Sequence, residues 1–127
     1  MVVKLVSKES KYEYGHKLED EPKDAWPVFS LKYLSAEEVM QIDDAIVVSA
    51  KDREDGFSYL GGTAVRMKID AALVDWKNVF DEKGNQVPCT TQNKLRLPSA
   101  IATALVKNID EVNGLVKTRE KREYEKN

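Results

Sequence analysis

The 127-residue chain has only one cysteine and one histidine, and it contains no long apolar run. A single cysteine cannot form an internal disulfide, which favours a reducing compartment. One cysteine and one histidine supply at most two zinc ligands, which excludes the common structural zinc sites. The amino-terminal residues MVVKLVSKESKYEYGH lack the apolar core of a signal peptide, and no segment approaches the roughly 20 apolar residues of a membrane span. We therefore expect a cytoplasmic protein that does not contact a membrane.

The chain also lacks a strong excess of one charge, because 20 basic residues face 22 acidic ones, for a formal net charge of −2. This balance gives no general attraction to nucleic acid. The basic residues of 117–127 alternate with glutamates that would repel phosphates, and no nucleic-acid motif is present. We expect no nucleic-acid partner.

The length suits one globular domain, which we place at 1–116, followed by a charged tail or helix extension at 117–127. A domain of this size buries roughly two-thirds of the surface that its unfolded chain exposes, so it folds without metal or disulfide bonds. The predicted elements indicate an α+β fold that is mostly helical, with a short antiparallel β unit near the amino terminus.

The central segment, 63–88, is the most informative part of the chain. Its apolar positions repeat with the period of one helical face, which predicts a helix that brings Trp76 into the core. A turn is expected at 81–85, where Gly84 can adopt a positive φ and Asp81 can accept backbone hydrogen bonds. The helical face consists of Val65, Ile69, Ala72 and Trp76, widened by Leu73 and Phe80, with Arg66, Lys68 and Asp70 pointing elsewhere.

The amino-terminal half predicts two strands and one helix. Residues 2–6 are apolar and β-branched, and residues 28–33 alternate between apolar and polar, so we expect these two segments to pair across a polar loop. Ser35 and Glu38 form a capping-box pattern, which predicts a helix that starts just after Ser35 and ends near Ala50. Gly61 and Gly62 are expected to form a flexible joint before the central helix.

The carboxy-terminal part predicts two further helical segments. Thr90 and Thr91 can cap a single turn that runs to Leu95, and Pro98 can open the last main helix at its first position. That helix carries an apolar stripe and ends at the stop signal of residues 113–114. The stripe consists of Ile101, Leu105, Ile109 and Val112.

No pattern in the sequence indicates catalysis. His16 has no neighbouring partner for acid–base or metal chemistry, and Cys89 lacks an adjacent base or resolving cysteine, so we expect it to be an ordinary thiol. We expect no enzymatic activity, no cofactor and no metal site.

Aromatic residues at the junctions of elements are either core residues or anchors for a protein partner, since tryptophan and tyrosine dominate interface hot spots. Leu105 and Ile109 on the last helix are further candidates for a partner surface if their stripe is wider than the core can cover. The aromatic candidates are Trp26, Phe29, Tyr33, Trp76 and Phe80.

The segment LVDWKNVFDEKGNQVPCTTQNKLRLP resembles small proteins of tailed bacteriophages and prophages. The resemblance covers a helix that ends in a tryptophan, an aspartate, a glycine-containing turn, a Val-Pro pair, and a Leu-Pro pair that opens the last helix. An aromatic strand before a Leu-Ser-x-x-Glu helix start extends this outline over most of the chain. The matching positions are Trp76, Asn78, Asp81, Gly84, Val87, Pro88, Asn93, Leu97 and Pro98, with 34–38 at the helix start.

Several proteins of that group are regarded as tail assembly chaperones, which bind the tape measure protein until tail tube subunits polymerise around it. The resemblance therefore implies a non-enzymatic morphogenesis protein in the cytoplasm of a bacterial host, with tape measure or tail tube proteins as partners and possible homo-oligomers. The alternatives are a structural or head–tail joining protein of the virion, and a small phage-encoded regulator of a host protein.

Overall fold

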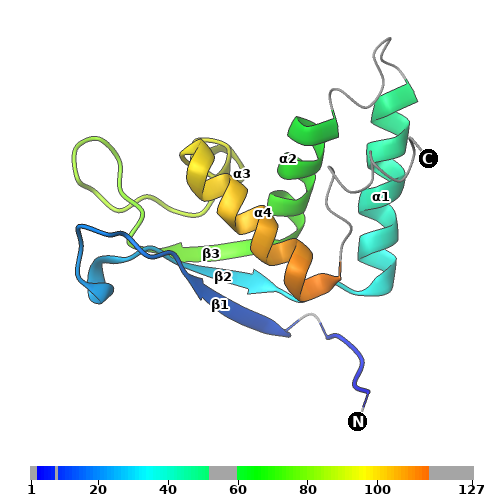
Figure 1. Cartoon of the computed structure of the whole chain (residues 1–127), viewed down its shortest axis with the longest axis horizontal. Coiled ribbons are helices and arrows are strands. Elements are labelled where there is room, and N and C mark those ends of the chain that lie inside the picture. The colour runs from blue at the N-terminus through cyan, green and yellow to red at the C-terminus, as the bar shows by residue number, and fades with distance from the viewer. Residues whose placement is uncertain (1–2, 8, 52–59, 115–127) are drawn as a thin grey trace.

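The computed structural model describes residues 3–7, 9–51 and 60–114, which form an α+β fold with the helices on one side of an antiparallel sheet (Figure 1). The sheet order is β1-β2-β3, so β2 is the central strand. A short 3-10 turn, Lys23–Ala25, lies between the first two strands. The main elements are β1 (Lys11–Gly15), β2 (Val28–Lys32), α1 (Ala36–Lys51), α2 (Leu60–Ala72), β3 (Leu73–Lys77), α3 (Thr91–Lys94) and α4 (Ser99–Asn113).

The first strand does not lie where the sequence predicts it. Residues 3–6 form no strand, and Val3 and Leu5 are exposed. Instead β1 comes from the polar segment that was expected to be a loop, and it pairs with β2. The reason is the alternation of Tyr12 and Tyr14, which places both rings opposite the buried side chains of Leu31 and Phe29. The prediction of β2 itself is confirmed.

The third strand corrects the prediction that the central helix continues to Trp76. The helix ends at Ala72, and Trp76 lies in β3. The register shifts between Ser30 and Leu31, which pair with Asp75 and Leu73, so Val74 is the extra residue of a β-bulge. Because of this bulge, Leu73 and Trp76 both face the core although they are three residues apart.

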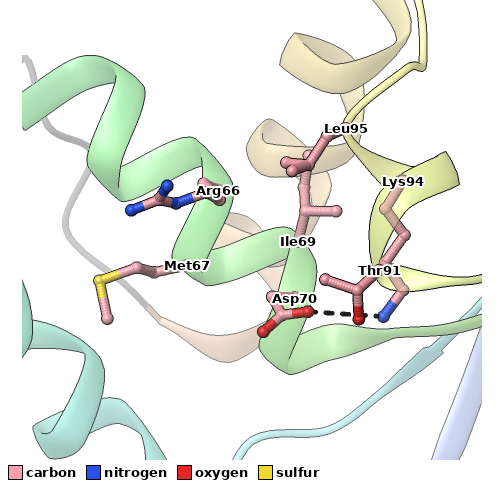
Figure 2. A pocket seen from close by; sticks show the side chains of 7 residues that line it. All are labelled: Arg66, Met67, Ile69, Asp70, Thr91, Lys94 and Leu95. Atoms are coloured by element: carbon pink, nitrogen blue, oxygen red, sulfur yellow. Dashed lines mark ion pairs between the residues drawn. The ribbon is translucent and has the colours of Figure 1, made fainter.

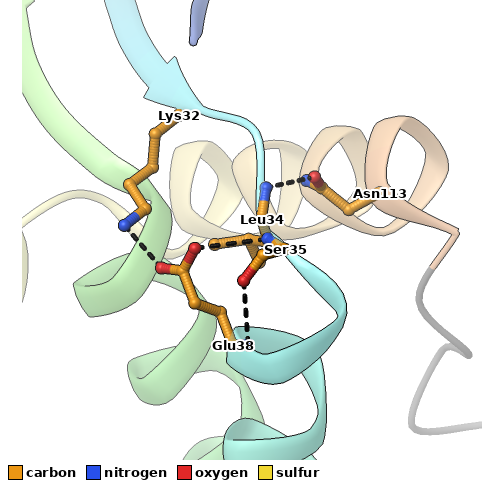
Figure 3. Close-up of polar contacts among 5 residues, drawn as sticks. All are labelled: Lys32, Leu34, Ser35, Glu38 and Asn113. Atoms are coloured by element: carbon orange, nitrogen blue, oxygen red, sulfur yellow. Dashed lines mark hydrogen bonds and ion pairs between the residues drawn. The ribbon is translucent and has the colours of Figure 1, made fainter. Parts of the chain in front are cut away.

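The capping box at the start of α1 is present (Figure 3). The backbone amide of Glu38 donates to Ser35 Oγ, and the amide of Ser35 donates to Glu38 Oε1, both at 3.2 Å. Lys32 forms an ion pair with Glu38, and the two contacts lower the pKa of the Glu38 carboxyl. Asn113 Oδ1, at the end of α4, accepts from the amide of Leu34 at 2.8 Å, which joins the last helix to the first.

The helix boundaries confirm most of the predicted stop signals. Gly114 ends α4 with a φ of 67°, a left-handed conformation that glycine adopts without a Cβ clash. Pro98 lies one position earlier than expected, at the N-cap. Gly61 and Gly62 are not a joint, because they form the first turn of α2. Residues 52–59 and the predicted tail at 117–127 lie outside the described residues.

The predicted turn at 81–85 is confirmed. Asp81 Oδ1 accepts from the amides of Lys83 and Asn85 at 2.9 Å, and Gly84 has a φ of 83°. The returning chain bonds back to the outgoing one through the amide of Val87 and the carbonyl of Val79 at 3.0 Å. Thr90 then caps α3 by accepting from the amide of Asn93, also as predicted.

The core lies between the sheet and the helices, and it includes a buried ion pair. Lys68 Nζ on α2 lies 2.8 Å from Asp110 Oδ1 on α4, and both side chains are 3% exposed. The expectation that Lys68 points away from the core is therefore wrong, because the buried face of α2 includes Ala64, Lys68 and Ala72. The buried apolar side chains are Phe29, Leu31, Leu34, Ile42, Ala64, Ile69, Ala72, Leu73, Trp76, Leu105 and Ile109.

We predict that Trp76→Ala lowers the free energy of unfolding by about 3–5 kcal/mol, because it removes a large buried aromatic. Trp76→Phe should cost less, about 1 kcal/mol for the lost hydrogen bond from Nε1 to the carbonyl of Val87. Denaturant melts of both variants measure the two losses in the free energy of unfolding. A loss below about 1 kcal/mol in Trp76→Ala would contradict the burial of this side chain.

We predict that Lys68→Met lowers the free energy of unfolding by about 3–5 kcal/mol, because the buried Asp110 carboxylate loses its ion pair with Lys68. The double variant Lys68→Met/Asp110→Leu should recover part of this loss, since both charges of the pair are then removed from the core. Lys17→Met is the control, because Lys17 and Glu19 form an exposed pair at 4.0 Å. Equal stability of the Lys68 and Lys17 variants would refute the structural role of the buried pair.

Candidate partner-binding groove

Three of the five aromatic candidates have structural roles. Phe29 is fully buried, and its ring meets Trp76 edge to face at a centroid distance of 6.3 Å. Trp26 is half-buried, and its Nε1 donates to the carbonyls of Leu18 at 3.1 Å and Glu21 at 3.0 Å. It therefore anchors the loop before β2.

The other two aromatic candidates are exposed. Tyr33 lies just after β2 with its ring centroid 4.8 Å from that of Tyr12. Burial, together with the nearby Tyr33, raises the pKa of Tyr12 to about 12. Phe80 lies at the base of the 81–85 turn and lines a cavity of about 250 Å³ with Leu97 and Pro98.

The two candidates on α4 do not form a partner surface. Leu105 and Ile109 are both 0% exposed and belong to the core, because the sheet and α2 cover the stripe at these positions. The stripe is uncovered only at its end, where Val112 is exposed. The sequence could not show this, since how much of the α4 stripe is buried depends on where β3 and α2 pack.

The structure instead places a groove between α2 on one side and α3 with the start of α4 on the other. Two adjoining cavities of about 300 and 380 Å³ form it, and we call them together the α2–α3 groove. Both are lined by Arg66, Ile69, Lys94 and Leu95. Figure 2 shows the first cavity, with side chains of α2 facing those of α3.

The walls of the α2–α3 groove are largely apolar. Ile69 is buried at its floor, and Leu95 is 59% exposed at its rim. Val65, Leu97 and Ala102 extend the apolar lining into the second cavity, where all three are half-buried. The exposed Leu95 and this hollow apolar lining together offer a partner an apolar surface to cover.

The charge of the groove is centred on Lys94. Its Nζ lies 4.0 Å from Asp70 Oδ1, and the Lys94 side chain is only 11% exposed whereas that of Asp70 is 58% exposed. Figure 2 shows Asp70 reaching from α2 toward Lys94 and Thr91. This distance exceeds the 2.7–2.9 Å that is usual for a charge-assisted hydrogen bond, so the pair is loose.

The residues weighed for catalysis have ordinary surroundings. His16 Nδ1 lies 2.9 Å from the hydroxyl of Tyr14. Burial raises the pKa of the Cys89 thiol, the Asp75 carboxylate raises it further, and the Lys94 ammonium opposes both. Among the described residues, no three His, Cys, Asp or Glu side chains lie where they could hold a metal ion together.

Sequence reasoning missed the groove, although one signal was present. Leu95 ends the predicted single turn and Leu97 precedes the last predicted helix, and no periodic apolar pattern includes either residue. Their common position on one wall follows only from the fold, since Asn93 Nδ2 donates to the carbonyl of Pro88 at 2.9 Å and so orients α3.

Comparison with protein-family models, with curated proteins and with solved structures found no match to this chain. In the part of the chain that the structure describes, no helix combines the length and apolar character needed to cross a membrane.

We predict that Cys89 is alkylated with a higher pH midpoint in the native protein than in the unfolded chain. Burial keeps the thiol protonated, so the thiolate forms only at higher pH. Lys94→Met should move the midpoint further upward, since it removes a charge that favours the thiolate. The measurement is the pH profile of the iodoacetamide rate, whose midpoint is independent of steric access. A downward shift in Lys94→Met would contradict the electrostatic assignment.

Proposed function

We propose that this chain is a non-enzymatic bacteriophage morphogenesis protein, a tail assembly chaperone that holds a helical segment of the tape measure protein in the α2–α3 groove. The observation that carries the proposal is the pair of adjoining cavities with shared apolar walls. The resemblance of residues 73–98 to small phage proteins supports it, because that segment includes α3 with Leu95 and Leu97, which line one wall of the groove.

The shape of the groove favours a helix as the bound segment. Helix-in-groove recognition places side chains at positions i, i+3 or i+4, and i+7 into successive pockets of a partner. Two cavities side by side along α2 suit two such successive side chains, and the exposed Leu95 can contact both because it lines each of them. Binding of this kind requires no catalytic group.

The chain would act in the cytoplasm of the bacterial host, where tape measure and tail tube proteins are made. It would leave the complex when the tube polymerises, so it should be missing from mature particles. Self-association through exposed apolar surface, such as that at Phe80, is compatible with this role.

We predict that Leu95→Glu weakens retention of a co-expressed tape measure fragment by about tenfold, the effect of a contact residue worth ~1.4 kcal/mol. The reason is that a charge at the rim of both cavities opposes burial of an apolar helix. Copurification of the soluble complex measures the loss, and thermal melts check that the variant is folded.

Met40→Glu is the matched control, because Met40 on α1 is 58% exposed, close to the 59% of Leu95, and lines neither cavity. This control should retain the fragment fully. Equal loss in both variants, or full retention in both, argues against the groove as the binding site. Presence of the chain in purified virions, without binding to any tape measure segment, would replace the chaperone by a structural protein.

A further inference from the structure

The ion pair in the α2–α3 groove differs from the ion pair in the core. The buried pair of Lys68 and Asp110 has a distance of 2.8 Å and two covered side chains, so it serves the packing of α2 on α4. Lys94 and Asp70 are 4.0 Å apart, and the Asp70 side chain is mostly exposed. Water can therefore solvate Asp70 when Lys94 turns to another anion, so the cost of exchanging this partner is small.

The rest of the groove adds positive rather than negative charge. Arg66 lines both cavities, whereas Asp70 is the one acidic residue among the described residues that line them. Ser99, in the first turn of α4, lines the second cavity, and no side chain caps this helix at Pro98. The helix dipole thus places a partial positive charge at the same end of the groove.

We propose that the α2–α3 groove selects an acidic amphipathic helix, whose apolar face covers Ile69 and Leu95 and whose carboxylate replaces Asp70 as the partner of Lys94. This inference rests on the groove being a binding site, as in the proposed function. It adds the chemistry that distinguishes one apolar helix from another. Apolar burial supplies affinity for any such helix, and the partly covered Lys94 ammonium supplies the preference for an acidic one.

The test uses two designed peptides of about 20 residues, a length that retains some helicity in water. Both carry leucine at the a and d heptad positions, and the flanking positions are glutamate in one peptide and glutamine in the other. Fluorescence anisotropy with the full chain gives the two dissociation constants. We expect the glutamate peptide to bind about tenfold more tightly at low salt, with a smaller ratio at high salt.

Variants at the ion pair separate a specific contact from a general charge effect. Lys94→Met should lose most of the preference for glutamate, whereas Asp70→Asn should increase it, because the internal competitor is gone. Lys107→Met is the control, since Lys107 is exposed on α4 and lines neither cavity, and it should keep the native ratio. If the two substitutions only disturbed packing, they would not change the ratio of the two dissociation constants in opposite directions.

Equal binding of both peptides to the native chain, no binding of either, or an unchanged ratio in Lys94→Met would each overturn the inference. Failure of this inference and failure of the proposed function give different results. A tape measure fragment retained without any charge preference removes only the selectivity. A glutamate preference that depends on Lys94, without binding of any tape measure segment, keeps the selectivity and removes the chaperone.

Discussion

The hydrogen bond from Trp76 Nε1 to the carbonyl of Val87, 2.7 Å long, connects the sheet to the chain reversal that leads into α3. The indole lies against Phe29 of the central strand, so its position is set by the core. The carbonyl that it holds belongs to the returning arm of the 79–87 reversal. The next residue, Pro88, accepts from Asn93 and orients α3. One wall of the α2–α3 groove is thus placed by a residue of β3.

The opposite wall depends on α2, which contacts α1, α4 and β3. Its buried face combines small and apolar residues with Lys68, whose ammonium is matched by Asp110. Such a pair contributes little net stability, but separating the two buried charges is costly, so the pair constrains how α2 packs on α4. The same helix offers Asp70 and Arg66 to the groove. α2 therefore contributes one residue to a buried ion pair, Lys68 with Asp110, and one to a partly exposed pair, Asp70 with Lys94.

The error at Trp76 has a specific cause. Ala72, Leu73 and Trp76 follow a helical spacing in the sequence, and a regular strand would not bury two residues three positions apart. The bulge at Val74 adds one residue to β3 and so brings both Leu73 and Trp76 to the core face. Whether the periodicity continues a helix or crosses a bulge depends on pairing with Ser30 and Leu31, residues more than 40 positions away. The misplaced first strand has the same origin, because the choice between 2–6 and Lys11–Gly15 is made by the partner strand.

Local signals were sufficient for the features that depend on neighbours in the sequence. The capping box of Ser35 and Glu38, the turn held by Asp81 and Gly84, the cap at Thr90 and the stop at Gly114 all formed as predicted, since each is a backbone hydrogen-bonding requirement met within a few residues. The α+β class followed from the same local patterns. The buried role of Lys68, the loose pairing of Lys94 and the apolar walls that join Ile69 to Leu95 were decided only by tertiary structure. Their burial and charge environment are set by elements distant in the sequence, which no local periodicity encodes.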